Sequence, residues 1–330
     1  MSLLVVLEHD RGALAEASLE ALTAGRDLAA KLDTALDAVI VAPPGDASAG
    51  PTAAWIDEAG RYGAETVHVV VADQLIDYGP DAAAASVLQL ADDTDADAVL
   101  AAGTDRGNEV LAQIAARADA PFVANALAVD VGDPWSITRV QWGGSLLEDV
   151  QLSSDRPLLT VAHHGVAAEP AVEPVEPAVA VFEPELDEAD LVTMVCDRDV
   201  LSQGVTLATA PVVVSGGRGV GSAEGFEALE ELAGMLGGVV GCSRAVTNNG
   251  WRPHTDQVGQ TGTRIAPDIY IAAGISGAIQ HWVGAMASKR ILAINTDPEA
   301  NMVAKADYAV IADLHEIIPA ISAEIRRRRS

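Results

Sequence analysis

The chain has 330 residues, with 48 acidic and 20 basic side chains and a formal net charge of −28. A chain this acidic would be repelled by nucleic acid phosphates and by anionic membrane surfaces, which excludes both as partners. Hydrophobic residues make up 49% of the chain, enough for sizeable cores, so we do not expect disorder over most of it. At roughly 150 residues per domain, the length indicates two domains.

No stretch approaches the roughly 18 to 20 apolar residues that are needed to span a bilayer. The N-terminus turns acidic at Glu8 and lacks the basic start and the cleavage site of a signal peptide. The two cysteines, Cys196 and Cys242, lie far apart in the sequence, so neither a disulfide framework nor a thiolate metal site is indicated. We therefore expect a soluble, cytoplasmic protein that is not embedded in a membrane.

The acidic charge is concentrated in the first two thirds of the chain. Residues 1–204 hold 36 acids and 9 bases, whereas residues 205–330 hold 12 acids and 11 bases. An acidic, lysine-poor surface is typical of a cytoplasm rich in salt, because carboxylates hold water and ions screen their mutual repulsion. We interpret the charge as the adaptation of a halophilic, salt-accumulating organism. Some constraint must keep the C-terminal part nearly neutral.

The N-terminal part alternates short apolar runs with alanine- and leucine-rich stretches of helical character. The expected elements are a strand over 3–7, a helix over 13–32, a strand over 38–41, a break at Pro43-Pro44-Gly45, a helix over 53–59, a strand over 66–71, a helix over 82–90, a strand over 98–101 and a helix over 108–117. This alternation predicts a mostly parallel sheet covered by helices on both faces. Residues 122–161 are β-rich with a Gly143-Gly144 turn, and we expect them to add strands at one edge.

Residues 168–190 have the composition of a linker. The pair Glu-Pro recurs there four times, at 169–170, 173–174, 176–177 and 183–184. Proline cannot donate to a β-ladder and stiffens the chain, while glutamate keeps it solvated. We interpret the stretch as a solvated spacer that could also lie across a partner. The chain is then divided into an N-terminal domain (1–167), a linker and connection (168–204) and a C-terminal domain (205–330).

A second α/β unit begins at Pro211. Its expected elements are a strand over 212–214, a glycine-rich turn over 215–221, a helix over 223–236, strands from 239 and over 269–272, a helix over 276–287, strands over 291–294 and 308–311, and a closing helix over 314–328. The arginine run in the closing helix fits the negative C-terminal end of the helix dipole better than it fits a nucleic acid patch.

Two segments that follow strands of this unit carry arginine. The turn Ser215–Gly221 has glycines that let backbone amides approach an anion, and Arg218 could reach a phosphate or an aromatic plane. It is neither a P-loop nor a complete GxGxxG, because Ser222 stands where the lysine or the third glycine would be, so a tight structural turn is the alternative. Ser243-Arg244 lies beyond a strand end, where open α/β sheets bind ligands, unless Arg244 is only a surface residue.

Two further segments offer small and neutral polar groups. Residues 257–263 contain glutamines, threonines and glycines that suit the edge of a neutral heterocycle, with a polar surface loop as the alternative. Residues 273–281 run from a strand through a small-residue turn into a helix, whose first amides can hold a pyrophosphate. Ala278 excludes a nucleophile elbow, which needs glycine at that position. His281 lies one turn into this helix, where a packing or surface role is the alternative.

The N-terminal half offers fewer candidates. His163-His164 is a possible metal-binding pair, but adjacent strand residues point to opposite faces, so we expect no metal site. The segment Gly103–Gly107 follows a strand and is interpreted as an N-capped turn that opens a helix. No Ser/His/Asp or Cys/His set stands out, and we expect no catalytic residue.

The four C-terminal segments occur together and in order, and in them the chain resembles the α subunit of electron-transfer flavoproteins. The resemblance is dense from about residue 211 to 320 and rests on Val214–Gly219, Ser243–Ala245, Gln257–Gly262, Tyr270–His281, Ala293–Pro298, Ala306–Tyr308 and Ala312–Leu314. Over residues 1–165 it is looser and rests on Val6–His9 and the α/β order. It implies a Rossmann-like C-terminal domain that binds FAD, and a heterodimer in which the β subunit completes the FAD site.

The resemblance also implies which residues contact FAD. They are Arg218, Ser243, Arg244, Val258, Gly259, Gln260, Thr261, Ser276, Gly277, Ala278, Ile279, Gln280, His281, Asn295, Asp313 and Leu314. Arg244 would stabilise a reduced anionic ring, Thr261 would bond its N5 edge, and His281 would sit at its O2/N1 side. Arg218 and the amides of residues 276–278 would serve the pyrophosphate. Asn295, Asp313 and Leu314 would lie toward the adenosine.

The implied function is that of an electron carrier rather than an enzyme, since the redox chemistry belongs to the flavin. Electrons would come from flavin dehydrogenases, such as the acyl-CoA dehydrogenases of fatty acid β-oxidation, and pass to a membrane quinone oxidoreductase. Thr247–Asn249 and Thr263 depart from the acidic residue and the lysine that are common in the family, which leaves the redox potential and the choice of partner open. A flavin- or NAD-dependent oxidoreductase with its own substrate, and a non-redox nucleotide-binding module, are the alternatives.

Overall fold

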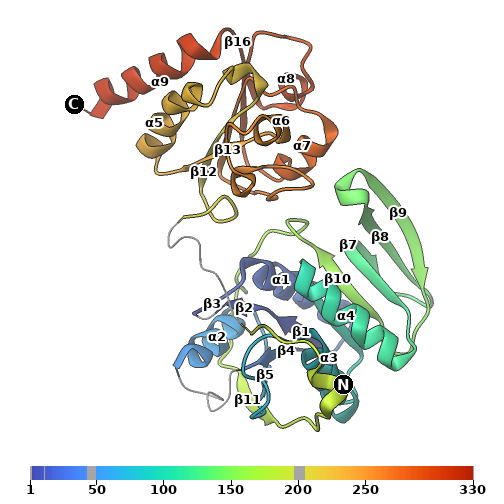
Figure 1. Ribbon diagram of the computed structural model, residues 1–330. Coiled ribbons are helices and arrows are strands. Elements are labelled where there is room, and N and C mark those ends of the chain that lie inside the picture. Colours follow the sequence, from blue (N-terminus) through green and yellow to red (C-terminus); the bar gives the residue numbers. More distant parts are fainter. Residues whose placement is uncertain (1, 11, 43–49, 197–204, 330) are drawn as a thin grey trace. The chain divides into compact units, whose positions relative to one another are not determined.

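The computed structural model describes residues 2–10, 12–42, 50–196 and 205–329 (Figure 1). The chain forms two compact units, the first mainly within residues 1–199 and the second mainly within residues 200–330. Both units are α/β, as the sequence predicts. Among the described residues, no helix has the length and apolar composition needed to cross a membrane. The predicted break at Pro43-Pro44-Gly45 lies outside the described residues.

The first unit is built on one large sheet, whose described strands run in the order β11-β5-β4-β1-β6-β10-β7-β8-β9. All neighbours from β11 to β7 are parallel, and β7, β8 and β9 pair antiparallel. The strands are β1 (Ser2–Leu7), β4 (Ala35–Val41), β5 (Thr66–Val70), β6 (Ala98–Gly103), β7 (Phe122–Asp130), β8 (Trp135–Gln141), β9 (Leu146–Leu152), β10 (Leu158–Ala162) and β11 (Ala178–Phe182). The order confirms a mostly parallel sheet with antiparallel strands added at one edge.

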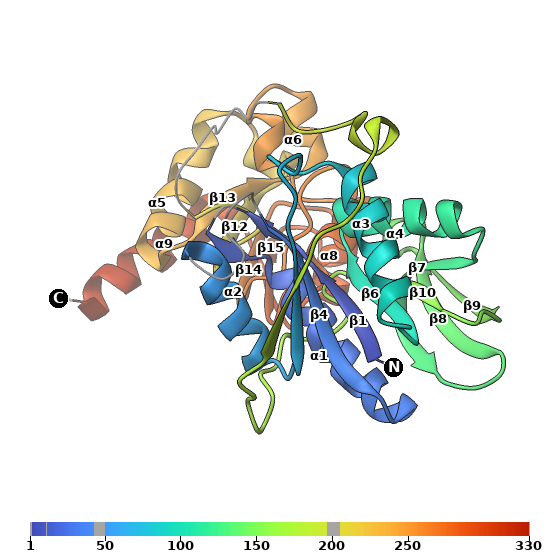
Figure 2. The ribbon, with the colours of Figure 1, turned by 90° about the horizontal axis from the view of Figure 1, so that it is seen from below.

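Helices cover both faces of this sheet (Figure 2). They are α1 (Glu16–Leu32), α2 (Gly50–Arg61), α3 (Pro80–Asp93) and α4 (Asp105–Ala118). Leu3 and Val5 of β1 pack on the side of α1 and α2, whereas Leu4 and Val6 pack on the side of α3 and α4. Because both faces are buried, β1 is a continuous apolar run. The chain builds β4 and β5 on one side of β1 and then returns to β6 on the other, so the topological switch point lies between β1 and β6.

Two of the predicted elements of this unit differ from the structure. The helix expected over 13–32 begins at Glu16, because Ala13–Leu14 forms a short strand, β3, that pairs with β2 (His9–Asp10). Leu158–Ala162 was expected among the added edge strands, but β10 lies inside the sheet and pairs parallel with β6 and β7. Its five residues are all buried, which is what an interior parallel strand requires.

The glutamate- and proline-rich segment packs on the first unit, which corrects the expectation of a solvated spacer. Residues 178–182 form β11, which pairs in parallel with β5 and completes one edge of the sheet. Earlier in the segment, Arg26 Nη1 donates to the Glu169 carbonyl, and the Val175 amide donates to the Gly60 carbonyl at 3.1 Å. Later, Arg117 and Asp190 form an ion pair at 2.7 Å. The alternating Ala-Val-Ala-Val-Phe run supplies the β-forming residues that its flanking prolines obscure.

The second unit has a parallel sheet in the order β13-β12-β14-β15-β16. Its strands are β12 (Val212–Gly216), β13 (Val239–Cys242), β14 (Ile269–Ala273), β15 (Ile291–Asn295) and β16 (Tyr308–Ile311), and its helices are α5 (Glu227–Leu236), α6 (Arg244–Asn248), α7 (Ile279–Ala285), α8 (Asn301–Lys305) and α9 (Leu314–Arg329). Counted along the chain this is the order 2-1-3-4-5, a common doubly wound arrangement with its switch point between the first and third strands. It confirms the predicted Rossmann-like class.

Helices again cover both faces of the sheet. α5 and α9 pack on one face and α7 and α8 on the other. The arginine run of α9 is engaged locally, since Arg326 pairs with Glu231, and both Arg327 and Arg328 pair with Glu324. These ion pairs agree with a structural role for the run.

The contact of the glutamate- and proline-rich segment with α2 can be tested at Gly60. A Cβ there would lie 2.4 Å from the Val175 carbonyl oxygen and 2.6 Å from Pro177 Cδ. We expect Gly60→Ala to destabilise the first unit by about 1–3 kcal/mol in urea unfolding, because the segment must move away. Gly234→Ala is the matched control, since it is also helical but has nothing within 4 Å. The control should be neutral or stabilising, and equal effects of the two changes would contradict this packing.

Candidate functional site

A cavity of about 530 Å³ lies at the C-terminal edge of the second sheet, around its switch point. Its wall is formed by the loops that follow β12, β13, β14 and β15. The residues expected at the site that line it are Arg218, Ser243, Arg244, Ser276, Gly277, Ala278, Gln280, His281 and Asn295. Gly219, Ala245, Gly274, Ile275, Asp297 and Ala300 complete the lining. Three of the four segments chosen separately in the sequence, at 215–221, 243–244 and 273–281, therefore meet around one space.

Glycines allow two of these loops to touch. A Cβ on Gly217 would lie 2.2 Å from the Gly274 carbonyl oxygen, and one on Gly219 would lie 2.8 Å from Gly274 Cα. The Gly219 amide donates to the Gly274 carbonyl at 3.1 Å. Gly274 itself has φ +63°, which favours glycine. The loops after β12 and β14 are thus joined backbone to backbone, and any side chain at Gly217 would separate them.

The turn after β14 presents unpaired backbone donors. In the described part of the chain, the amides of Ser276, Gly277 and Ala278 donate to no protein acceptor, whereas the Gly274 amide donates to the Ile294 carbonyl at 2.8 Å. Gly277 has φ +78°, and a Cβ there would lie 2.4 Å from the Met302 amide nitrogen. The turn therefore holds its backbone against α8 and leaves successive N–H groups available to an anion.

Two arginines give the cavity a positive charge. Arg218 follows β12 and Arg244 opens α6, and both side chains are exposed. Within the described ranges, no carboxylate lies at ion-pairing distance from either guanidinium. The lining acid, Asp297, accepts a hydrogen bond from the Glu299 amide at 2.9 Å. Unpaired arginines beside unpaired amides suit a phosphorylated ligand.

Asn295 has a role within the protein. Its Nδ2 donates to the Ile275 carbonyl at 3.0 Å, and its Oδ1 accepts from the Asp297 amide at 3.1 Å. The side chain thus ties the loop after β14 to the loop after β15. Asn295 thus holds the shape of the cavity from within its lining.

His281 is buried at the base of the cavity, with 7% of its surface exposed. Its Nε2 and the Tyr270 hydroxyl are 2.7 Å apart, and Tyr270 is fully buried in the core. Burial lowers the pKa of His281 to about 4. The imidazole is therefore neutral at pH 7, so that any effect on a flavin would come from hydrogen bonding rather than from positive charge.

The remaining predicted residues do not line the cavity. The loop Val258–Thr261 lies beside it, since the Gln260 amide donates to the Gln280 carbonyl at 2.7 Å and Thr261 Oγ1 accepts from Gln257 Nε2 at 3.0 Å. Asp313 Oδ1 accepts from the His315 amide at the start of α9, and Leu314 is buried in the core. Ile279 is exposed at the start of α7. Leu314 packs against the cavity wall at Gly274, since its Cδ2 lies 2.7 Å from the position that a Cβ of Gly274 would take.

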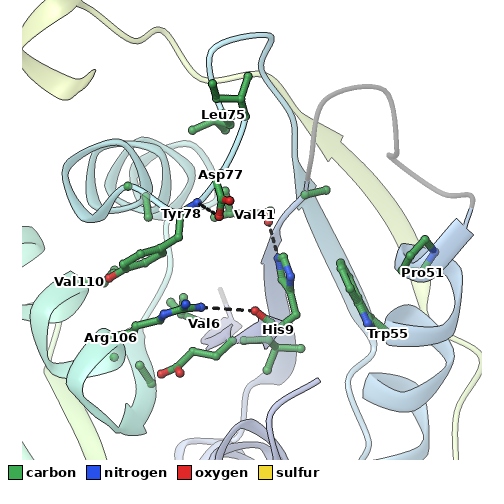
Figure 3. A pocket seen from close by; sticks show the side chains of 18 residues that line it. Val6, His9, Val41, Pro51, Trp55, Leu75, Asp77, Tyr78, Arg106 and Val110 are labelled. Carbon is green, nitrogen blue, oxygen red and sulfur yellow. Dashed lines mark hydrogen bonds between the residues drawn. The ribbon is translucent and has the colours of Figure 1, made fainter. Parts of the chain in front are cut away.

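The first unit has a cavity of about 330 Å³ at its own switch point, which was not predicted from the sequence (Figure 3). Figure 3 shows His9 and Trp55 on one side of it and Tyr78 and Arg106 on the other. The rings of His9 and Trp55 stack with centroids 4.0 Å apart, and the Arg106 guanidinium lies 4.5 Å from the centre of the Tyr78 ring. The walls come from segments far apart in the chain, and no single motif marks them.

Glu8 distinguishes this cavity from the one in the second unit. Its carboxylate accepts a hydrogen bond from the Thr104 hydroxyl at the start of α4, and burial raises the pKa of Glu8. Thr104 Oγ1 also accepts from the Gly107 amide at 3.0 Å, which confirms the N-capped turn expected over Gly103–Gly107. Glu8 therefore occupies this helix start with a carboxylate of the protein itself, while Arg106 lines the same cavity.

The two neighbouring histidines lie in a turn after β10, not in a strand, so the expectation that they face opposite sides is wrong. His164 has φ +60°, and this left-handed conformation brings its ring onto that of His163 with centroids 3.7 Å apart. His164 Nδ1 is 3.1 Å from Glu20 Oε1. Both histidine rings therefore lie on the same side of the chain, next to the Glu20 carboxylate of α1.

The doubly wound sheet, the glycine contact and the unpaired donors define an α/β protein of the nucleotide-binding class. Its sequence matches the electron transfer flavoprotein domain over residues 3–187 and the electron transfer flavoprotein FAD-binding domain over residues 206–286. It is 37% identical to the electron transfer flavoprotein subunit alpha of Mycobacterium tuberculosis, over 99% of this chain and 98% of that protein. It is 36% identical to protein FixB of Bradyrhizobium diazoefficiens, over 98% and 88%. The chain belongs to the electron transfer flavoprotein α-subunit and FixB family.

The burial of His281 predicts a pH dependence of stability. Its pKa is about 4 in the folded protein and about 6.5 in an unfolded chain, so the unfolded chain takes up the proton first as the pH falls. The stabilisation is complete above pH 6.5 and is lost as the pH falls toward 4, by about 2 kcal/mol between pH 7 and pH 5. Urea unfolding of the second unit measures it. His281→Gln, which cannot titrate, should lose this part of the dependence, and an unchanged pH profile would refute it.

Proposed function

We propose that the chain is the FAD-binding α subunit of a heterodimeric electron-transfer flavoprotein. In this proposal it accepts electrons from flavin dehydrogenases, such as acyl-CoA dehydrogenases, and delivers them to a membrane quinone oxidoreductase. The observation that carries the proposal is the cavity at the switch point of the second sheet, most of whose lining falls in the segment matched by the family's FAD-binding domain. We place this activity in the cytoplasm.

The residues present fit a dinucleotide with a diphosphate. The unpaired amides of residues 276–278 and the Arg218 guanidinium supply donors and positive charge for the diphosphate. The contact of Gly217 with Gly274 keeps side chains away from that backbone. Arg244, on the neighbouring loop, would lie at the ring end and favour a reduced, negatively charged ring. When bound, FAD supplies the acceptance and release of electrons, and the protein holds and tunes it.

The exposure of the site supports a partner subunit. Arg218, Arg244, Ser276 and Gln280 line the cavity and are nevertheless exposed in the isolated chain. A flavin held only by these groups would remain open to solvent on one side. We infer that an electron-transfer flavoprotein β subunit covers this side, in keeping with the relatives whose names describe them as α subunits.

The state of His281 supports a carrier over an enzyme with its own substrate. A substrate-converting flavoenzyme would need an acid or base beside the ring, and His281 was the candidate from the sequence. Burial lowers its pKa to about 4 and its Nε2 is engaged by Tyr270, so it is poorly placed to exchange protons with a substrate. In our proposal it positions the adjoining wall of the cavity and stays neutral.

The decisive experiment is co-expression of the chain with its β subunit. We expect the purified heterodimer to show the visible absorption of one bound FAD, to be reduced by a flavin dehydrogenase with its substrate, and to turn over no small substrate by itself. A heterodimer without bound flavin would overturn the carrier proposal. Steady turnover of a small substrate without a dehydrogenase would favour the enzyme alternative.

Arg244 should tune the flavin. We expect Arg244→Ala to lower the reduction potential by roughly 30–60 mV, because losing a hydrogen bond from a charged group costs about 1.5–3 kcal/mol and the couple transfers two electrons. Arg290→Ala is the matched control, since Arg290 is also exposed but lies at the opposite end of the strands, before β15. Potentiometric titration measures both. Equal reduction potentials for Arg244→Ala and the parent protein would contradict the placement of Arg244 at the ring.

The net charge supports the further proposal that the protein is adapted to a salt-rich cytoplasm. We expect its unfolding midpoint to rise from low to molar KCl, because ions screen the repulsion among surface carboxylates. The rise should be larger for the first unit, since residues 1–204 carry nearly all the excess of acids. Thermal unfolding followed by tryptophan fluorescence, in variants that keep the tryptophans of one unit only, measures the midpoint of each unit separately. Midpoints that do not change with salt would refute the adaptation.

A further inference from the structure

A cluster of potential metal ligands lies in the first unit, apart from the cavity of the second. It consists of Glu20 on α1 and of His163 and His164 in the turn that follows β10. One ligand atom of each residue lies within 4.8 Å of the others. Glu20 is 5% exposed and both histidines are partly buried, so the donors are withdrawn from bulk water.

The backbone of the turn is shaped to bring the donors together. His164 adopts φ +60°, a conformation that costs a residue with a side chain of order 1 kcal/mol or more. The turn is closed by the Gly165 amide, which donates to the Ala162 carbonyl at 2.8 Å, and by the His164 amide, which donates to Glu20 Oε2 at 2.8 Å. The two imidazole rings stack with their centroids 3.7 Å apart and their planes 28° apart, so both lie on the same side of the turn.

The hydrogen bonds of the cluster leave one nitrogen unsatisfied. His164 Nδ1 is 3.1 Å from Glu20 Oε1, whereas His164 Nε2 is buried and has no hydrogen-bond partner among the described residues. An unpartnered buried polar atom costs about 1–3 kcal/mol, so the ring is held in place at an energetic cost that its protein contacts do not recover. Nδ1 is therefore the nitrogen of His164 that a metal shared with Glu20 would take, and Nε2 lies outside that contact.

We propose that Glu20, His163 and His164 bind one divalent transition-metal ion of the zinc type. Two imidazoles and one carboxylate are the donors that zinc, cobalt and nickel prefer, whereas calcium and magnesium prefer oxygen alone. The 3.1 Å separation of Glu20 Oε1 and His164 Nδ1 is close to the distance between two ligands that share a metal at about 2.0–2.2 Å. Water completes the coordination, since the chain supplies three ligands.

The position of the cluster indicates a structural role. The turn that holds the histidines is where the chain leaves β10 and doubles back along α1, and the Glu169 amide then donates to Thr23 Oγ1 of α1 at 3.1 Å. A metal bound by Glu20 and the two histidines would clip the end of β10 to α1 one helical turn before this contact. It would stabilise the first unit and leave the flavin cavity, built in the second unit, without a direct effect.

Zinc binding by the metal-stripped full-length heterodimer tests the proposal. Isothermal titration with Zn²⁺ should show one saturable site, and His163→Ala should weaken it by more than about tenfold, since losing even an outer-shell partner of a ligand costs about 10–100-fold. His163 is the variant of choice because it leaves the bonds between His164 and Glu20 in place. His315→Ala, at an exposed histidine of α9, is the matched control and should bind zinc like the parent protein.

Two further readouts separate a metal site from a merely structural cluster. Co²⁺ in place of Zn²⁺ should give visible ligand-field absorption in the parent protein and in His315→Ala but not in His163→Ala. Zinc should raise the thermal midpoint of the first unit only when His163 is present, while in chelator the parent protein and His163→Ala unfold at similar temperatures. Equal zinc affinities of the parent protein and His163→Ala, or the absence of saturable binding, would overturn the proposal. Neither result would bear on flavin binding.

Discussion

The second unit depends on the contact between two backbones at Gly217 and Gly274. The loops after β12 and β14 can meet only where neither has a side chain, and this meeting fixes the floor of the cavity. From there, Gly219 bonds to Gly274, Leu314 supports Gly274 from the core, and Asn295 ties in the next loop. The absence of side chains at Gly217 and Gly274 therefore places residues that lie far apart in the sequence. The positions of the unpaired amides and of the two arginines depend on this contact.

The two units use similar architecture but place different groups at their switch points. Each has a doubly wound sheet and a cavity at its switch point. In the second unit the cavity is lined by unpaired amides and by Arg218 and Arg244. In the first, Glu8 occupies the start of α4 and Arg106 lies against the ring of Tyr78. The first unit thus has a similar sheet but fills the start of α4 with a carboxylate of its own. The near-neutral charge belongs to the second part of the chain, and the acidic excess belongs to residues 1–204.

The sequence predicts the parts of the fold that are written in short-range patterns. Apolar runs locate β1 and β12, and glycine turns with arginines locate loops that form the cavity of the second unit. Contacts between segments far apart in the chain were not predictable, because local sequence patterns carry no sign of them. Prolines around residues 178–182 hide the strand β11, and the left-handed turn at His164 cannot be read from two adjacent histidines. The neutral state of His281 follows from burial beside Tyr270, which no local pattern shows.

The position of β11 has a consequence for how the chain can be divided. Its residues 178–182 cover the backbone edge of β5, although they follow the body of the first unit in sequence. A protein shortened at residue 167 would leave the polar backbone of β5, with its buried valines, as an open sheet edge. Such an edge is a template for pairing between molecules, so the shortened domain would be prone to aggregation. During synthesis, likewise, the edge of β5 stays unpaired until β11, which ends about fifteen residues after residue 167, has left the ribosome.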